Sequence, residues 1–398
     1  MIIETRKDGD RVTLILAGRL DTATSSQASA DIDRLLATVS PETRLTCDAE
    51  RLEYISSSGL RILLSLSKRY KDFRIIEAQS MVYEVLDTTG FTKIMTVERA
   101  LRHLSVEGCE VIGVGGVGTV YRLDGDTIIK VFREGTTIDE VRHEITMSKE
   151  AFVMGMPTAI SFDMVQVGSQ YGLVYELLQA DTLSACIKRE PKRIDEFARK
   201  YADLFRQLHA IEVSGGSSVP CAIERERQQI HHIRRYFSQE AIDLMLRIVD
   251  AIPDASRLMH LDLQAKNAMV QNGELMLIDM GEVGYGHPML DLGHAYSAMV
   301  TLVGDYDKIV GMPRELGQTL WNHAIDYYLE GLPTEVIKQR KAQIEVISCV
   351  RNFSWLALSD SFPETVVNEC KALFDERIGR RKDYILDVCK TFGGWMLE

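Results

Sequence analysis

The stretch MHLDLQAKNAMVQNGELMLIDMGE (Met259–Glu282) contains three polar side chains at informative spacings. Asp262 and Asn267 are five residues apart, and Asp279 follows a short hairpin signal at Val270–Glu274. Because a hairpin folds the chain back on itself, this order predicts that the polar side chains gather in one place. Carboxylate and amide oxygens are ligands that magnesium prefers in proteins, although Asp and Asn also cap ordinary turns.

The same spacing is typical of the catalytic loop of kinases, in which an aspartate precedes an asparagine by five residues and a metal-binding aspartate follows. In this interpretation Asp262 accepts the hydroxyl proton of the phosphate acceptor. Asn267 and Asp279 then hold Mg²⁺ over the phosphates of ATP. Lys266 is placed either to reach the transferring phosphate or to remain a solvated loop charge, and the sequence leaves both open.

A glycine-rich stretch, VIGVGGVGTVYRL, begins at Val111. Its spacing fits a dinucleotide-binding turn as well as the flap that covers ATP in kinases. A dinucleotide-binding turn leads into a helix, whereas Thr119–Tyr121 favours a strand and Asp124–Asp126 then predicts a hairpin. The context therefore favours the phosphate-covering flap. The glycines that would let the backbone approach the phosphates are Gly113, Gly115 and Gly118.

The flap interpretation requires a lysine on the following strand, and TIIKVF supplies Lys130. Such a lysine needs a carboxylate from the next helix to hold it in position. Glu144 in EVRHEITMSKEAF is the best candidate, and Glu140 and Glu150 are the alternatives on the same helix. We therefore expect Asp262, Lys130 and Glu144 to form the catalytic set.

These motifs resemble the aminoglycoside phosphotransferase and choline-kinase branch of the protein-kinase-like fold. The matching segments are HLDLQAKN (His260–Asn267), IDMGE (Ile278–Glu282) and HPMLDLGHAY (His287–Tyr296). The resemblance implies that Asp291 braces the catalytic loop. It also implies that VYELL leads into a hinge whose backbone binds adenine, and this gives Glu176 and Leu178 as nucleotide-binding residues. Gln264 and Met280 depart from the family pattern, but neither departure removes a catalytic group.

The N-terminal part resembles the STAS domain, the fold of bacterial anti-sigma factor antagonists. The segments that carry this resemblance are AGRLDTATS and LTCDAERLEYISSSGLRILL. The resemblance implies that Ser58 is a phosphorylation site and that Asp21 and Asp48 lie near it. The aspartate of the family motif is Ser56 here, and the serines could instead simply cap the helix that follows.

The predicted elements divide the chain into two domains. Residues 1–106 alternate strands and helices, which predicts a small α/β domain. Residues 107–398 predict an α+β bilobal protein-kinase-like domain. In this domain residues 107–178 form a small β-rich N-lobe, and residues 179–398 form a large helical C-lobe.

Composition narrows the range of partners. The chain has 398 residues and a formal net charge of −12, which argues against a nucleic-acid surface because such binding relies on Lys and Arg. No signal-peptide pattern is visible, and no apolar run approaches the roughly 18 residues of a membrane span. The seven cysteines are scattered, as expected of reduced thiols in a cytoplasmic protein.

The leading hypothesis is an ATP- and Mg²⁺-dependent kinase that transfers phosphate to an alcohol group of a small molecule or a protein. The N-terminal domain would then regulate the enzyme or dock a protein partner. The alternative is a nucleotide-sensing regulatory protein of the anti-sigma factor antagonist type. A third hypothesis joins the two, with the kinase domain phosphorylating Ser58 or a serine of a related protein.

Overall fold

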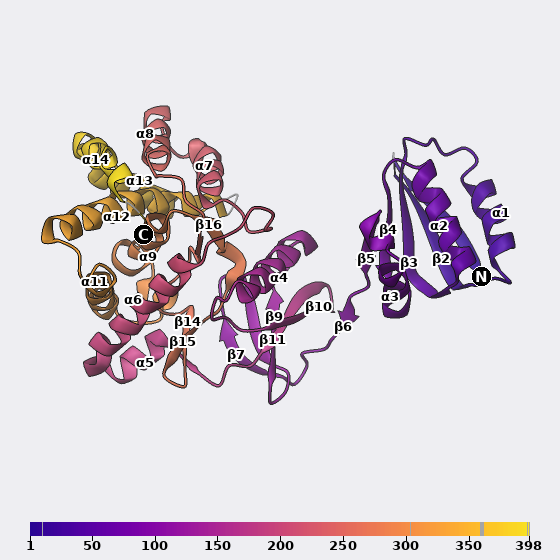
Figure 1. The fold of residues 1–398 in the computed structure, drawn as a ribbon, viewed down its shortest axis with the longest axis horizontal. Coiled ribbons are helices and arrows are strands. Elements are labelled where there is room, and N and C mark those ends of the chain that lie inside the picture. Colours follow the sequence, from indigo (N-terminus) through magenta and orange to yellow (C-terminus); the bar gives the residue numbers. More distant parts are fainter. Residues whose placement is uncertain (10, 303, 359–361, 396, 398) are drawn as a thin grey trace. The chain divides into compact units, whose positions relative to one another are not determined.

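The structure is a computed structural model that describes residues 1–9, 11–302, 304–358, 362–395 and 397. The chain forms two compact units, Met1–Leu104 and Ser105–Glu398 (Figure 1). The expected order, an α/β domain followed by a bilobal kinase-like unit, is confirmed. Among the described residues, no helix is both long and apolar enough to cross a membrane.

The first unit contains one sheet whose strands are ordered as in the sequence. β1 pairs antiparallel with β2, and the later pairs are parallel. The strands are β1 (Ile2–Asp8), β2 (Arg11–Leu20), β3 (Arg44–Ile55), β4 (Phe73–Ala78) and β5 (Thr96–Arg99). The helices are α1 (Ser25–Leu35), α2 (Ser57–Arg69) and α3 (Ser80–Thr88).

The core of this unit follows from the apolar runs of its central strands. Leu14 and Leu16 of β2 and Leu45 and Cys47 of β3 are fully buried. β1 lies at the edge of the sheet with no buried residue, so it lacks the apolar run that would reveal it in the sequence. A short strand, β6 (Arg102–His103), follows β5 along the chain but does not belong to this five-stranded sheet.

The second unit begins with an antiparallel sheet in the order β10-β11-β9-β8-β7. Its strands are β7 (Glu110–Val114), β8 (Gly118–Arg122), β9 (Thr127–Phe132), β10 (Ser161–Val167) and β11 (Gln170–Glu176). α4 (Ile138–Val153) packs against β10 and β11. Thr137 and Glu140 form a capping box that fixes the start of α4.

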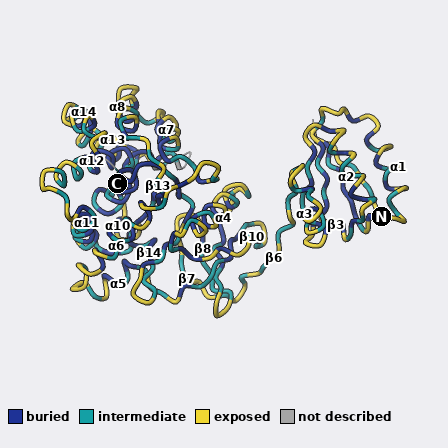
Figure 2. The backbone as a smooth tube through the Cα atoms, in the orientation of Figure 1, coloured by how far each residue is buried: buried dark blue, intermediate teal, exposed yellow. Residues whose placement is uncertain are grey.

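The rest of the second unit is mostly helical. Figure 2 shows its buried backbone concentrated inside the helical part, with exposed helix ends and loops around it. The helices are α5 (Leu183–Arg189), α6 (Ile194–Ala210), α7 (Ala222–His232), α8 (Gln239–Asp250), α9 (Pro288–Tyr296), α10 (Tyr306–Val310), α11 (Arg314–Tyr328), α12 (Thr334–Ser354), α13 (Glu364–Arg377) and α14 (Lys382–Cys389). The short strands are β12 (Asp181–Thr182), β13 (Arg257–Met259), β14 (Ala268–Gln271), β15 (Glu274–Leu277) and β16 (Gly284–Gly286).

Candidate active site

The loop between β13 and β14 carries Asp262 and Asn267. Asn267 donates from Nδ2 to the main-chain oxygen of Asp262 at 2.9 Å and to its Oδ2 at 2.8 Å. The Asp262 N–H donates to Nδ1 of the buried His260, whose Nε2 faces the Ile278 carbonyl at 3.1 Å. These partners fix the imidazole with its proton on Nε2, so His260 joins the catalytic loop to the strand that leads to Asp279.

Leu261 has a φ of +64° although it is a buried leucine. This left-handed conformation costs about 1–2 kcal/mol for a residue with a Cβ, so the surroundings must enforce it. Asp291, at the start of α9, provides that constraint. Its carboxylate accepts from the N–H groups of Leu261 at 2.8 Å and His260 at 3.2 Å.

His209 of α6 supports Asp291 from the other side. Its Nε2 lies 3.2 Å from Asp291 Oδ2, and its Nδ1 lies 2.9 Å from the Tyr328 hydroxyl. Burial acts to raise the pKa of Asp291, but the hydrogen bond from His209 and the other nearby donors hold that pKa below its ordinary value. Asp291 is therefore a buried, ionised brace.

His294, one turn further along α9, holds the carbonyl of the strained residue. Its Nδ1 lies 3.0 Å from the Leu261 oxygen, and its Nε2 lies 2.9 Å from Glu226 Oε1 on α7. Burial acts to raise the pKa of Glu226, but His294 and then Arg351 lower it to about 2. Both main-chain groups of Leu261 are thus bound by side chains of α9.

The surroundings of Asp262 bring the pKa of its carboxyl group close to neutral pH. Burial first, and then the neighbouring Asp279 carboxylate, raise the pKa of Asp262 to about 7. A general base works best when its pKa is near the operating pH. Asn267 binds Oδ2 of Asp262, and within the described residues no hydrogen bond is present to its Oδ1.

Asp279, Lys130 and Glu144 form a second group beside this loop. Lys130 Nζ lies 2.7 Å from Glu144 Oε1 and 3.1 Å from Asp279 Oδ1. Burial acts to raise the pKa of Asp279, but the Lys130 ammonium outweighs it and lowers the pKa. Asp279 has a φ of +66° and a side chain that is 41% exposed, so its carboxylate borders open space.

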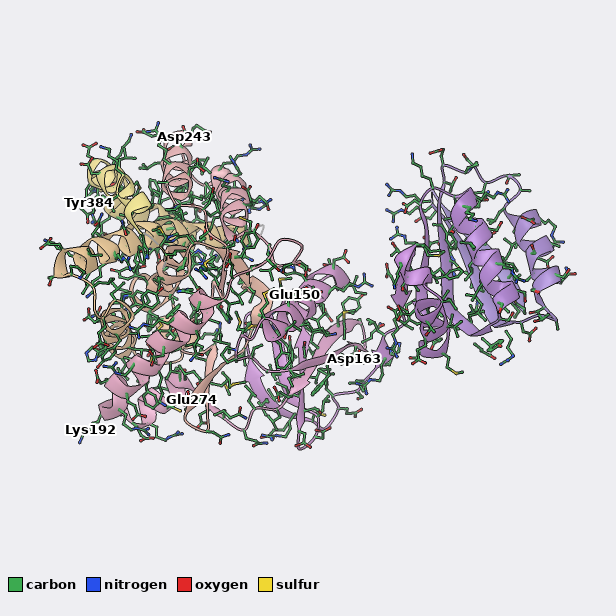
Figure 3. The ribbon with its side chains drawn as sticks, viewed as in Figure 1. Glu150, Asp163, Lys192, Asp243, Glu274 and Tyr384 are labelled. Atoms are coloured by element: carbon green, nitrogen blue, oxygen red, sulfur yellow. The ribbon has the colours of Figure 1, made fainter. Side chains whose placement is uncertain are left out.

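The structure distinguishes among the three acidic candidates of α4. Glu144 is the residue that contacts Lys130. Glu140 belongs to the capping box at the beginning of the helix. Glu150, at the other end of α4 (Figure 3), contacts the hydroxyls of Ser217 and Ser218.

The predicted hinge follows β11. The Glu176 carboxylate accepts from the Ile160 N–H at 2.7 Å, and the Glu176 N–H donates to the Ile160 carbonyl at 3.0 Å. Leu178 is buried just after the strand. One residue before Glu176, the Tyr175 hydroxyl donates to Glu144 Oε1 at 3.0 Å.

The glycine-rich flap is the turn between β7 and β8. The Gly115 N–H donates to the Gly118 carbonyl at 2.8 Å, and Arg133 Nη2 donates to the Gly115 carbonyl at 3.2 Å. A Cβ at Gly118 would lie 2.3 Å from the Val131 oxygen, so this position requires glycine for packing. Gly113 and Gly115 have room for a Cβ.

The residues predicted to hold magnesium fit the ion. Repulsion from Asp279 contributes to the raised pKa of Asp262, and a divalent cation would relieve that repulsion. Both bonds from Asn267 to Asp262 use Nδ2, so the Asn267 amide oxygen is the atom that would serve as a metal ligand. Across the described parts of the chain, no three His, Cys, Asp or Glu side chains form a metal cluster. A magnesium ion held by one or two protein ligands and nucleotide phosphates needs no such cluster.

Lys266 lies on the catalytic loop between Asp262 and Asn267 and is partly buried. Its side chain passes near Gly311, where a Cβ would lie 3.8 Å from Lys266 Cγ. The structure therefore places its stem against the C-lobe and leaves its role open.

In the first unit, Ser56 caps α2 by accepting from the Gly59 N–H at 3.4 Å. Its hydroxyl also lies 2.8 Å from the Ser58 hydroxyl, so the expected capping role falls to Ser56 rather than Ser58. Asp21 caps its own turn through the N–H groups of Ala23 and Thr24. The N–H of Glu50 donates to Asp48 Oδ1 at 3.0 Å.

Sequence reasoning missed several side chains that support the site, because their contacts join elements that are separate in the chain: β11, α6, α7 and α9. For two of these residues, closeness to a recognised motif was the one signal in the sequence. Tyr175 precedes the predicted hinge, and His294 follows Asp291 by three residues. The residues missed are Tyr175, His209, Glu226 and His294.

Two protein-family models match the chain. Residues 109–311 match the model of the phosphotransferase enzyme family (APH), and residues 3–104 match the STAS domain. No curated protein sequence matches the chain.

Solved structures of kinase-like enzymes are similar in fold. A choline/ethanolamine kinase family protein from Mesorhizobium loti is 16% identical, with 71% of this chain and 92% of that chain covered and a TM-score of 0.47. Amicoumacin kinase is 13% identical, with 74% and 92% covered and a TM-score of 0.47. The ADP-bound aminoglycoside phosphotransferase APH(2'')-Ib is 15% identical, with 73% and 96% covered and a TM-score of 0.43. The family match spans half of the chain and includes the whole candidate site, so the protein belongs to the phosphotransferase enzyme family and carries a STAS domain before it.

Proposed function

We propose that the protein transfers the γ-phosphoryl group of ATP, with Mg²⁺, to a hydroxyl group of a small molecule or a protein. The observation that carries this proposal is the connected network of the candidate site. Asp262 is bonded to Asn267, whose main-chain carbonyl accepts from the Ile278 N–H at 3.0 Å. The adjacent Asp279 contacts Lys130, which also contacts Glu144. This network brings together the residue types that phosphoryl transfer uses as base, metal ligands and phosphate-binding lysine.

The transfer forms a bond between the acceptor oxygen and the γ-phosphorus, and it breaks the bond from that phosphorus to the bridging oxygen. ADP leaves with the bridging oxygen. The hydroxyl proton passes to the Asp262 carboxylate, whose pKa of about 7 suits a base at neutral pH.

The chain's other groups bind and orient the nucleotide. Lys130, held by Glu144, neutralises phosphate charge, and the flap covers the phosphates with its backbone. Magnesium, when bound by Asn267 and Asp279, supplies a Lewis acid that neutralises charge on the phosphate oxygens. Glu176 and Leu178 border the predicted adenine site.

Turnover of ATP tests the proposal. Purified full-length protein is incubated with Mg-ATP and a panel of hydroxyl compounds, and ADP release and phosphorylated product are measured. The variant Asp262→Asn should keep nucleotide binding and lose about 10²–10⁴-fold in rate, the range typical of a general base. Equal rates for the parent and Asp262→Asn would remove Asp262 from its assigned role.

The same assay separates this proposal from a nucleotide-sensing regulator. A regulator of that kind would bind Mg-ATP and capture a partner in a nucleotide-dependent manner, but it would release no ADP with any acceptor. The retained Asp262, with its raised pKa, supports the enzyme because sensing alone has no use for a base.

For the STAS domain we propose docking or regulation through a protein partner, with Ser58 as a candidate phosphosite. Ser58 is the second residue of α2, in the first turn, where the positive helix end favours a phosphate. Intact mass after incubation with Mg-ATP, on the parent and on Ser58→Ala, tests modification by the chain itself. An unchanged parent mass would rule out modification by the chain itself.

All seven cysteines are free thiols, which supports the proposed cytoplasmic location.

A further inference from the structure

Lys130 is shared between two carboxylates in this structure. Its ammonium lies 2.7 Å from Glu144 Oε1 and 3.1 Å from Asp279 Oδ1. The proposed function requires Asp279 to be available to a magnesium–nucleotide complex and requires Lys130 to be available to phosphate. The preference of Lys130 for one carboxylate over the other therefore affects how readily the site accepts its nucleotide.

Tyr175 contributes the additional contact that distinguishes the two carboxylates. Its hydroxyl donates to Glu144 Oε1, the same oxygen that faces Lys130, at 3.0 Å. Burial and then the Glu144 charge raise the pKa of Tyr175 well above its ordinary value, so the hydroxyl keeps its proton and can only donate to the carboxylate. No such contact from Tyr175 to Asp279 is present among the described residues.

The backbone of the sheet keeps Tyr175 in this position. It is paired with Ile128 on β9 in the central part of the sheet, and it packs against the apolar cluster of Phe132, Val141 and Leu173. Glu144 is on α4, whose neighbouring His143 lies 3.2 Å from the Gly281 carbonyl near Asp279. The Glu144 carboxylate is thus contacted by Tyr175 of β11 and by Lys130 of β9, and its own helix contacts the segment that follows Asp279.

We infer that Tyr175 is a positioning residue whose hydroxyl holds Glu144 against Lys130 and thereby keeps Lys130 from settling on Asp279. Without that hydroxyl, the Glu144 carboxylate can rotate away and Lys130 pairs more closely with Asp279. The magnesium–nucleotide complex must then break a stronger ion pair in order to bind. This inference rests on the proposed use of Mg-ATP.

Calorimetric binding of magnesium and the non-hydrolysable analogue AMP-PNP to the full chain tests the inference without an acceptor. Tyr175→Phe should weaken binding by about tenfold, the loss expected for one hydrogen bond to a carboxylate. Tyr171→Phe is the matched control. Tyr171 is four residues earlier on β11, packs against the same apolar cluster, and makes no hydroxyl contact within the described part of the chain.

A double-mutant cycle links the effect to Glu144. In a Glu144→Ala background, Tyr175→Phe should cause no further loss of affinity. An equal loss in that background, unchanged affinity in the single variant, or a collapse of its thermal unfolding transition would overturn the positioning role. If the parent protein binds no Mg-AMP-PNP, the proposed function falls and this inference falls with it. If the parent binds but Tyr175→Phe binds equally well, only the inference fails.

Discussion

The buried Asp291 carboxylate accepts a 2.8 Å hydrogen bond from the N–H of Leu261, a residue held at a φ of +64°. This contact joins the start of α9 to the residue directly before the proposed base. It explains how a strained leucine can persist, because the carboxylate also binds the N–H of His260 and so fixes two consecutive peptide groups. Asp291 thus fixes the backbone directly before the proposed base Asp262.

Replacing Asp291 by Asn should destabilise the second unit by about 3 kcal/mol, since an amide must turn its NH₂ toward one of the donors that the carboxylate accepts. The rate should fall more than tenfold as the Asp262 loop relaxes. All three tryptophans lie in the second unit, so urea unfolding followed by tryptophan fluorescence reports that unit. The exposed Asp307→Asn serves as control, and similar losses in both variants would contradict the brace.

Glu226→Gln should have a related effect through the carbonyl of Leu261. His294 would lose the carboxylate that faces its Nε2 at 2.9 Å, and Arg351 would lose the same carboxylate, which lies 3.9 Å from its Nη1. We expect a loss of about 3 kcal/mol in the free energy of unfolding, typical of a broken buried ion pair. Glu224→Gln on the exposed face of α7 is the control. An unfolding midpoint for Glu226→Gln that equals the control would refute the contribution.

Two neighbouring glycines of the flap should respond differently to alanine. At Gly118 a Cβ would lie 2.3 Å from the Val131 oxygen, whereas nothing lies within 4 Å of one at Gly116. Gly118→Ala should push β8 away from β9, cost about 2 kcal/mol and weaken binding of Mg-AMP-PNP. Gly116→Ala should change stability by less than about 0.5 kcal/mol. Equal stability of the two variants in urea would contradict this prediction, because it would show that β8 and β9 can move apart at little cost.

The lowered pKa of His287 predicts that the free energy of unfolding decreases in mild acid. Burial lowers its pKa from 6.5 to about 4, so between these values the unfolded chain binds a proton that the folded chain does not. The stabilisation from neutral His287 is full above pH 6.5 and falls as the pH drops toward 4. We expect a loss of about 2 kcal/mol from this residue between pH 7.5 and pH 5.

The variant His287→Asn isolates that contribution. Its side-chain oxygen can still accept from the Met289 N–H at the start of α9, but it does not titrate. The difference in unfolding free energy between the parent and the variant should shrink from pH 7.5 to pH 5. A constant difference across this range would exclude His287 as the titrating group.

The sequence indicated the elements of the kinase-like unit because its apolar strands and turn residues are local signals. Thr127–Phe132 with Lys130, and the hairpin before Asp279, needed only a few neighbouring residues to be recognised. The edge strand β1 escaped notice because it has no buried residue. After Pro333 the chain forms the single helix α12, whereas the stretch after Pro363 divides into α13 and α14 around Gly379.

The order of the motifs was thus determined by the sequence alone, since each motif is set by the spacing of residues within one loop or strand. The contacts between motifs were decided by the tertiary structure. Three glutamates of α4 were candidates for Lys130, and only the packing of α4 against the sheet selected Glu144. Lys130 and Asp279 are 149 positions apart, so no local pattern could show that they meet. Tyr175 likewise became part of the site only when the strand and the helix came together.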